Sequence, residues 1–322
     1  EFTKIAFQNN KIDLIKAESI GDLIHAETEL QREQAANLVQ GHASKYYENL
    51  REKLVKSLSY IEAKIDFAED DLPGNVLKEV QKSIKQVHSD IKRILEDQKV
   101  GEKIRDGFRI SIIGDVNAGK SSLLNLLAKR DAAIVSEEEG TTRDVVETYL
   151  NIDGYPVILA DTAGIRKAKN KIEKEGIKRA IKKAKEADLT LVMIDVSKKT
   201  INSDIKKLIN NNCVLVFNKS DLSKKTPKNE FKKNDQILIS VKNNKNINTL
   251  IKTIKEKLSK KFMKTNNILV TRERHRAKLN EALKEIEKFL KKDQKKEIET
   301  AAEDLRLATR HLGGIVGKVD VE

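Results

Sequence analysis

Residues 114–121 read GDVNAGKS, a complete GxxxxGK[ST] phosphate-binding loop. Three further motifs follow it in the chain: GTTRD at 140–144, DTAG at 161–164 and NKSD at 218–221. The loop alone predicts only a nucleoside triphosphate. The Asp221 carboxylate adds the base, because it can accept hydrogen bonds from guanine N1–H and the exocyclic amine, which adenine does not offer together. The four motifs in this order predict a chain that binds and hydrolyses GTP.

Short β-prone runs surround these motifs, and amphipathic helical stretches separate most of them. The runs are Arg109–Gly114, Glu147–Ile152, Pro156–Asp161, Leu189–Asp195, Cys213–Asn218 and Ile237–Ser240. Such alternation predicts a largely parallel sheet covered on both faces, a P-loop Ras-like α/β domain. Asp153-Gly154 is typical of a hairpin turn, so one edge strand should be antiparallel.

Both ends of the chain have helical periodicity instead. One apolar stripe is Tyr47, Leu50, Leu54, Leu58, Ile61 and Ile65; a second is Val76, Val80, Ile84, Val87, Ile91 and Ile94; a third is Leu279, Leu283, Ile286 and Phe289, before a further helix near 297–312. These helices are too rich in Glu and Lys to be stable alone, so the two ends should pack in one bundle. We therefore expect a G domain at 107–262 inserted into an all-α domain made of 1–106 and 263–322.

Composition narrows the function classes. Of 322 residues, 39% are hydrophobic and 35% charged, with a net charge of +13. Lysine pairs are scattered and interleaved with Glu, and only 4% of residues are aromatic, so a solvated lysine-rich surface is favoured over a base-stacking one. No apolar run approaches the roughly 20 residues that span a bilayer. The single cysteine, Cys213, excludes an internal disulfide and fits a reducing compartment, so a cytoplasmic protein without membrane contact is expected.

The motifs assign chemical roles. Backbone N–H groups of the loop should cradle phosphates, Lys120 should neutralise the β- and γ-phosphates, and Ser121 should coordinate Mg²⁺. Thr142 is the expected second Mg²⁺ ligand, and Gly164 can donate its N–H to the γ-phosphate. Asp161 should lie at a strand end near the metal. Asn218, Lys219 and Asp221 should hold the base, with Ser240 a weaker candidate.

The residue after DTAG is not the glutamine that orients the attacking water in Ras-like enzymes. Ras-like enzymes place a Gln there to orient the attacking water, whereas this chain has Ile165. Asn117 offers an acceptor oxygen beside the phosphates, where a monovalent cation could supply positive charge; an ordinary loop-capping role fits equally well. Glu173 and Glu175 follow in the switch, with solvated helix-end charges as the default interpretation of both.

Flanking segments, and not only the four motifs, resemble the MnmE (TrmE) family of tRNA-modification GTPases. The similar segments are EFTKIAFQNNKIDLIKAESIGDLI at 1–24, IEAKIDFAEDDLP at 61–73, GDVNAGKSSLLN at 114–125, DTAGIR at 161–166 and GGIVGKV at 313–319. Generic bacterial GTPases share the motifs but not these helical segments.

The resemblance implies a potassium-activated GTPase whose G domains dimerise across their nucleotide faces. It implies K⁺ ligands in Asn117 and in switch residues Ser136, Glu138 and Thr141, and a catalytic acid at Glu173, which positions water. Glu138 stands at a position where members of this family commonly have an apolar residue. The residues then expected to line the nucleotide and its ions are Asn117, Ala118, Gly119, Lys120, Ser121, Ser122, Ser136, Glu137, Glu138, Glu139, Gly140, Thr141, Thr142, Asp161, Thr162, Ala163, Gly164, Asn218, Lys219, Asp221 and Ser240.

The resemblance further implies tRNA and the FAD protein MnmG as partners in modifying the wobble uridine of certain tRNAs. The family's folate-type one-carbon donor belongs to an N-terminal domain with no counterpart in this sequence, and its C-terminal Cys-containing tail has none either. We therefore expect this chain alone to hydrolyse GTP without modifying tRNA.

Two alternatives stay open. A ribosome-assembly GTPase of the Era or EngA kind should carry a KH-like domain after the G domain, but residues 274–312 show a helical stripe without a GxxG signature. A GTP-dependent interaction scaffold would bind nucleotide tightly with negligible turnover.

Overall fold

The computed structural model describes residues 1–67, 76–130, 147–160, 186–198, 200–201, 203–223, 231–262, 268–293 and 296–318. The chain divides into two compact units. One comprises residues 1–26, 31–105 and 265–322, and the other comprises 27–30 and 106–264. Each unit is described separately below.

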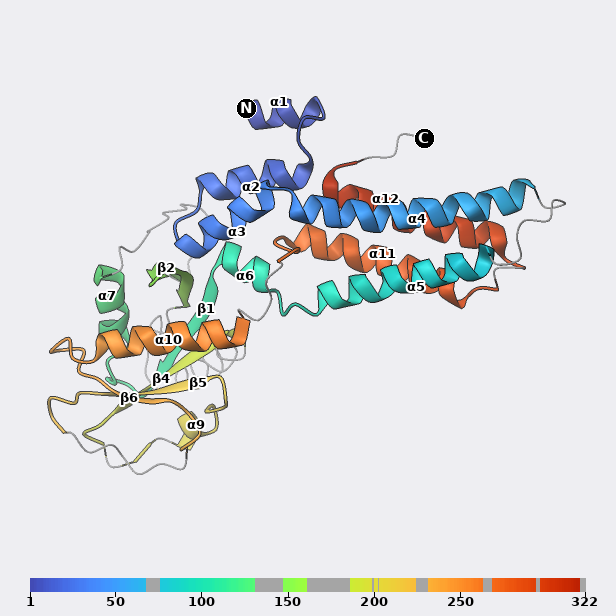
Figure 1. Ribbon diagram of the computed structural model, residues 1–322. Helices are drawn as coiled ribbons and strands as arrows, with labels where there is room; N and C mark the ends of the chain where they lie inside the picture. Colours follow the sequence, from blue (N-terminus) through green and yellow to red (C-terminus); the bar gives the residue numbers. More distant parts are fainter. Residues whose placement is uncertain are drawn as a thin grey trace, which may run out of the picture. The chain divides into compact units, whose positions relative to one another are not determined.

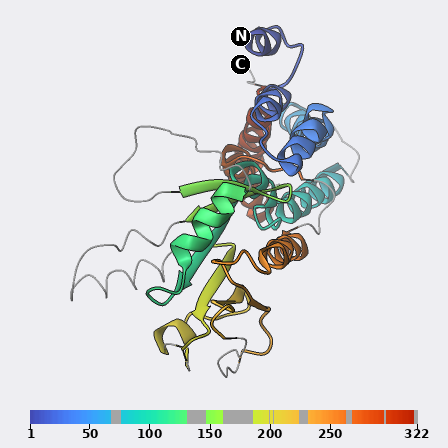
Figure 2. The same ribbon diagram turned by 90° about the vertical axis from the view of Figure 1, so that its left-hand side faces the viewer.

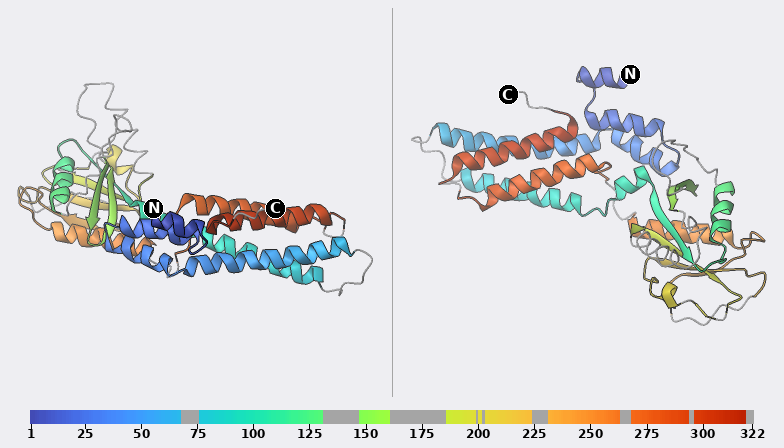
Figure 3. Two further views of the ribbon diagram at one scale, coloured as in Figure 1. Left: turned by 90° about the horizontal axis from the view of Figure 1, so that it is seen from above. Right: turned by 180° about the vertical axis from the view of Figure 1, so that it is seen from behind.

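The first unit is helical, with long helices contributed by both ends of the chain (Figure 1). Its elements are α1 (Phe2–Gln8), α2 (Leu14–Ile24), α3 (Glu29–Val39), α4 (His42–Asp66), α5 (Val76–Leu95), α6 (Val100–Asp106), α11 (Glu273–Lys291) and α12 (Ile298–Val316). Helix α4 packs on α5 and α12, and α11 packs on the same two helices, so the four lie side by side (Figures 1 and 3). The predicted bundle of N- and C-terminal helices is confirmed.

The bundle core consists of the stripes that periodicity predicts. On α4, Tyr47, Leu50, Leu54 and Ile61 are buried, and Leu58 and Ile65 pack partly buried beside them. The same core includes residues from α5, α11 and α12: Val80, Ile84, Val87, Ile91, Ile94, Leu279, Ile286, Phe289, Leu305, Leu312 and Ile315. Because one core draws on residues about 270 positions apart in sequence, neither terminal segment can bury its stripe without the other.

Ion pairs in this unit connect its N-terminal helices to helix α11. Glu18 of α2 accepts hydrogen bonds from Nε and Nη2 of Arg274, both at 2.6 Å, and its Oε2 lies 3.3 Å from Nε2 of the buried His275. Burial by itself would raise the pKa of Glu18, but the bonds from His275 and Arg274 lower that pKa to about 2. Arg276 pairs with Glu102 of α6 at 2.8 Å. These bonds join residues that precede the α/β unit in sequence to residues that follow it.

The second unit is an α/β domain around a six-stranded sheet of order β2-β3-β1-β4-β5-β6. Its strands are β1 (Phe108–Gly114), β2 (Glu147–Ile152), β3 (Tyr155–Ala160), β4 (Leu189–Asp195), β5 (Cys213–Asn218) and β6 (Gln236–Leu238). All neighbours are parallel except β2 and β3. The described helices of this unit are α7 (Lys120–Arg130), α9 (Ser203–Lys206) and α10 (Ile247–Phe262), with α7 running beside the strands (Figure 2).

The β2–β3 hairpin confirms the predicted turn. Asp153 has φ +48 and Gly154 has φ +91, the two positive values that a type I′ turn requires. The amide of Gly154 also donates to Oδ1 of Asn151 at 2.9 Å, which closes the turn. The antiparallel edge strand is therefore specified by two adjacent residues.

Central strands β4 and β5 are buried along their whole length, as expected for parallel strands covered on both faces. Cys213 begins β5 and is buried, and burial raises the pKa of its thiol. It belongs to the core cluster of β1, β4 and β5, as a small apolar residue should. Among the described residues, no helix is both long and apolar enough to cross a membrane.

Candidate nucleotide-binding site

The strand order places the motifs at one edge of the sheet. Strands β1, β4 and β5 are parallel neighbours, so their carboxyl ends meet there. In open α/β sheets, ligands bind outside the carboxyl ends of the strands. The phosphate loop follows β1, Asp195 ends β4, and NKSD begins at the last residue of β5.

The phosphate loop connects β1 to the N-terminus of α7. The Lys120 ammonium turns back over the loop and donates to the carbonyl oxygens of Gly114 and Asp115, both at 2.8 Å. Asn117 is exposed and has a left-handed φ of +62, a conformation that Asn tolerates better than most residues. Ser121 and Ser122 occupy the first turn of α7. A helix N-terminus and a lysine at one loop together form a site for an anion.

Asn218 joins this loop to the guanine motif. It is the last residue of β5 and only 3% exposed. Its Nδ2 donates to the carbonyl of Ala118 at 2.9 Å, and its Oδ1 accepts from the amide of Val241 at 3.1 Å. A Cβ on Gly119, which has φ +100, would lie 2.3 Å from that Nδ2. The contact therefore requires glycine at 119 for two reasons, space and backbone conformation.

The expected base-reading pair lies next to it. The buried hydroxyl of Ser240 donates to Oδ1 of the exposed Asp221 at 2.6 Å, while its oxygen accepts from the amide of Asn243 at 3.2 Å. The bond from Ser240 is the main cause that lowers the pKa of Asp221, with smaller contributions from Lys242 and Lys219. Asp221 is thus an ionised acceptor at neutral pH, which is the form that two guanine donors need.

An ion pair between Lys219 of the guanine motif and Asp195 of β4 was not predicted from the sequence. Lys219 has φ +69, and its Nζ lies 2.5 Å from Oδ2 of Asp195. Ser197 donates to Oδ1 of Asp195 from both its amide and its hydroxyl. Burial would raise the pKa of Asp195, but the bonds from Lys219 and Ser197 outweigh it and the pKa is lowered. The available signal was an acidic residue ending an otherwise apolar strand.

Another ion pair spans the loop and the end of β4. Nζ of Lys198 lies 3.0 Å from Oδ2 of Asp115 in the phosphate loop. Together with the Asn218–Ala118 bond, it fixes the loop to the last residue of β5 and to the segment that follows β4. Neither residue was among those predicted for the site.

The structure brings one group of predicted residues together at this edge. The group is Asn117, Ala118, Gly119, Lys120, Ser121, Ser122, Asn218, Lys219, Asp221 and Ser240. A second group lies outside the described residues, and its roles remain predictions: Ser136, Glu137, Glu138, Glu139, Gly140, Thr141, Thr142, Asp161, Thr162, Ala163, Gly164 and Glu173.

The family model described as the MnmE helical domain matches residues 14–322. The chain is 58% identical to the tRNA modification GTPase MnmE of Pelagibacter ubique (strain HTCC1062) and 44% identical to that of Rickettsia bellii (strain RML369-C); each match covers 100% of this chain and 73% of the relative. Among solved structures, the G domain of the T. maritima FeoB iron transporter aligns with 47% of this chain and 98% of its own, at 22% identity and a TM-score of 0.35. The family match and the two relatives show that the chain belongs to the MnmE family and is a GTPase.

Proposed function

We propose that this chain is a potassium-activated GTPase that hydrolyses GTP to GDP and phosphate in the service of tRNA modification. The observation that carries the nucleotide part is the bond between Asn218 and Ala118, since it holds the guanine motif against the phosphate loop at 2.9 Å. Phosphates would bind the loop amides and Lys120, and the base would bind Asp221. The names of the relatives, tRNA modification GTPases, support the tRNA part.

The residues present fit a magnesium–nucleotide complex. Glycine at 119 lets the loop pack directly against Asn218, and Lys120 already places its ammonium over the loop. The hydroxyl of Ser121 in the first turn of α7 and that of Thr142 are the ligands we assign to Mg²⁺. When bound, Mg²⁺ would neutralise charge that develops on the phosphate oxygens. The chain itself supplies the loop amides, which also favour negative charge there.

We assign activation by K⁺ to Asn117 together with Ser136, Glu138 and Thr141. Two observations support this assignment. Asn117 is exposed at the phosphate loop, and Ile165 replaces the water-orienting Gln of Ras-like enzymes with a side chain that cannot hydrogen-bond. Glu173 would orient the attacking water, and the Gly164 amide would contact the γ-phosphate. Dimerisation through the G domains would complete the site.

We further propose that this chain acts together with MnmG in the cytoplasm. Its GTP hydrolysis would support modification of the wobble uridine of tRNA. No observation favours the ribosome-assembly alternative, because residues 273–291 and 298–316 form helices α11 and α12 of the bundle.

Turnover at matched ionic strength in KCl and in NaCl tests the proposal. We expect hydrolysis in KCl to exceed that in NaCl by at least about tenfold, corresponding to roughly 1.4 kcal/mol of barrier. Asn117→Ala should abolish the difference, while Asn212→Ala, before β5, should preserve it. Equal rates in the two salts, or an Asn117→Ala variant that retains the difference, would reject potassium activation. Tight GTP binding with negligible turnover in both salts would favour a scaffold.

A further inference from the structure

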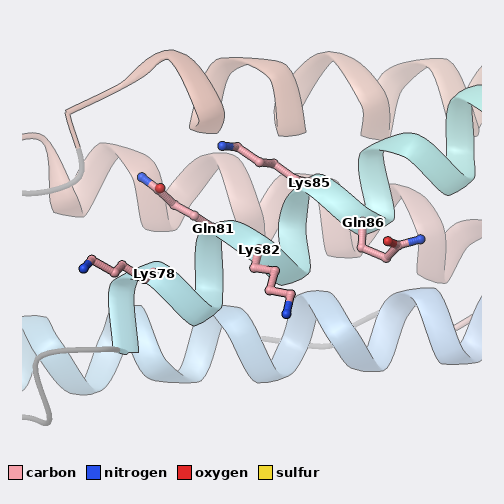
Figure 4. Close-up of a pocket in the computed structure, with 5 residues that line it drawn as sticks. All are labelled: Lys78, Gln81, Lys82, Lys85 and Gln86. Atoms are coloured by element: carbon pink, nitrogen blue, oxygen red, sulfur yellow. The ribbon is translucent and has the colours of Figure 1, made fainter.

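Helix α5 presents a stripe of basic residues on its outer face. Lys78, Lys82 and Lys85, here called the α5 lysine stripe, are all exposed. Their spacing of four and then three residues places them on one side of the helix, over about 10 Å of its axis. They line a shallow depression of about 410 Å³ together with Gln81 and Gln86 (Figure 4).

The lysines of the stripe lack acidic partners among the described residues. No carboxylate there lies within ion-pair distance of Lys78, Lys82 or Lys85, although many other bundle cations are paired. Lys92, two turns beyond Lys85 on α5, forms an ion pair with Glu287 at 3.5 Å, and Lys288 of α11 forms one with Glu285 at 2.7 Å. Glu79 is exposed on the same part of α5 and, three residues before Lys82, shares its side of the helix, but the two side chains are not within ion-pair distance. Like charges at such spacing repel, so the stripe favours an anionic partner.

The residue types on this face identify the kind of anion. Protein–protein interfaces are depleted in lysine and enriched in aromatic residues, whereas this face combines lysines with the amides of Gln81 and Gln86. Phosphate oxygens of nucleic acid are bound by Lys together with Gln, Asn and Ser side chains. Without aromatic rings among its lining residues, the depression offers no platform for stacked bases. The chemistry matches a sugar–phosphate backbone.

We propose that the α5 lysine stripe binds the phosphate backbone of tRNA. This inference rests on the proposed function, because that function supplies the RNA. The stripe contributes affinity and orientation without reading sequence. The scattered lysines elsewhere remain a solvated surface, as their composition predicts.

The experiment measures tRNA affinity over a range of KCl concentrations with the whole chain and unfractionated tRNA. Each phosphate contact contributes about 0.9 to the slope of log K against log salt on a duplex. Replacing the stripe as Lys78→Gln, Lys82→Gln and Lys85→Gln should therefore lower the slope by about two to three. Affinity at about 0.1 M salt should fall at least about tenfold.

Two control variants and one control measurement separate the role of the stripe from effects of net charge and folding. Lys129→Gln, Lys232→Gln and Lys233→Gln remove the same charge from exposed positions of the α/β unit and should leave the slope near the wild-type value. The triple Lys-to-Arg variant of the stripe keeps its charge and should restore binding. GTP hydrolysis without RNA should be the same in the stripe variant and the wild type.

The outcomes distinguish this inference from the proposed function. If wild type binds tRNA and the stripe variant has the same affinity and slope, the stripe assignment is wrong while the proposed function stands. If wild type fails to bind tRNA, the stripe assignment and the tRNA part of the proposed function are both wrong, while the GTPase part is judged by turnover in KCl and NaCl. If poly-glutamate displaces tRNA as well as duplex RNA of equal charge does, the stripe is a site for acidic protein and the RNA assignment is overturned.

Discussion

Asn218 donates from Nδ2 to the carbonyl oxygen of Ala118 at 2.9 Å, across 100 residues of sequence. The same side chain accepts from the amide of Val241 at 3.1 Å. One buried amide group therefore holds the phosphate loop, the end of β5 and the segment after β6 in a fixed arrangement. At the proposed site, the nucleotide phosphates and base would meet surfaces whose separation this amide sets.

Asn218→Ala should weaken guanine-nucleotide binding. The change leaves the Ala118 carbonyl and the Val241 amide without a partner, at about 1–3 kcal/mol, which corresponds to a loss of affinity of about fivefold to a hundredfold. Titration with a fluorescent GDP analogue measures it. The control variant Asn212→Ala, which changes the residue directly before the first residue of β5, should bind the GDP analogue as the wild type does. Wild-type affinity in Asn218→Ala would show that this amide does not organise the site.

Gly119→Ala should have a larger effect on binding than on folding. The new Cβ would lie 2.3 Å from Nδ2 of Asn218, at a residue with φ +100. Strain of about 1–3 kcal/mol, together with a displaced loop, should lower GDP affinity by at least about tenfold. Gly21→Ala is the matched control, because a Cβ on Gly21 within α2 meets nothing within 4 Å. That variant should raise the free energy of unfolding by up to about 1 kcal/mol. Equal GDP affinities in the two variants would contradict the packing described for the loop.

Acid should destabilise the helical unit through Glu18. Its pKa falls from 4.5 to about 2 on folding, so the carboxylate contributes stability above pH about 4.5 and loses it as pH falls toward 2. The contribution is on the order of 1–2 kcal/mol, since partial exposure screens the pairs with Arg274 and Arg272. His275, whose pKa burial lowers, adds loss in the same direction as pH falls.

Urea unfolding at several pH values measures this contribution. Glu18→Gln should lower the free energy of unfolding at pH 7 and flatten its dependence between pH 4.5 and 2. Glu48→Gln removes a partly exposed carboxylate paired with Lys318. It should change neither the free energy of unfolding at pH 7 nor its pH dependence by more than a few tenths of a kcal/mol. If the free energy of unfolding of Glu18→Gln depended on pH as that of the wild type does, Glu18 would not be a source of the acid sensitivity.

Much of the fold could be predicted because its signals are local. Strands β1 and β5 are largely apolar runs that end in a motif, and β4 and β5 have the predicted bounds. The last strand is shorter than expected, with Gln236–Leu238 in place of Ile237–Ser240. The reason is that Ser240 leaves the ladder to bond Asp221 and forms an isolated bridge with Lys245. A hydroxyl used for the site is not available to continue the strand.

Ion pairs between residues that are distant in sequence could not be predicted. Lys219 and Asp195 are 24 positions apart, and Arg274 and Glu18 are 256 apart. Neither pair has a motif, because an ion pair needs only opposite charges brought close by the fold. Periodicity likewise gives no sign that residues 27–30 group with the α/β unit, where the amide of Leu30 donates to the Gly154 carbonyl at 3.3 Å.

The proposed specificity for GTP depends most on the Asp221 carboxylate, and the nucleotide preference of the Asp221→Asn variant measures its role. An amide at this position offers a donor where guanine also has one, whereas xanthine presents a carbonyl oxygen there. We predict that GTP affinity falls and XTP affinity rises, so that their ratio changes by about a hundredfold or more in favour of XTP. A variant that still prefers GTP as strongly as the wild type would contradict the assignment of the base site.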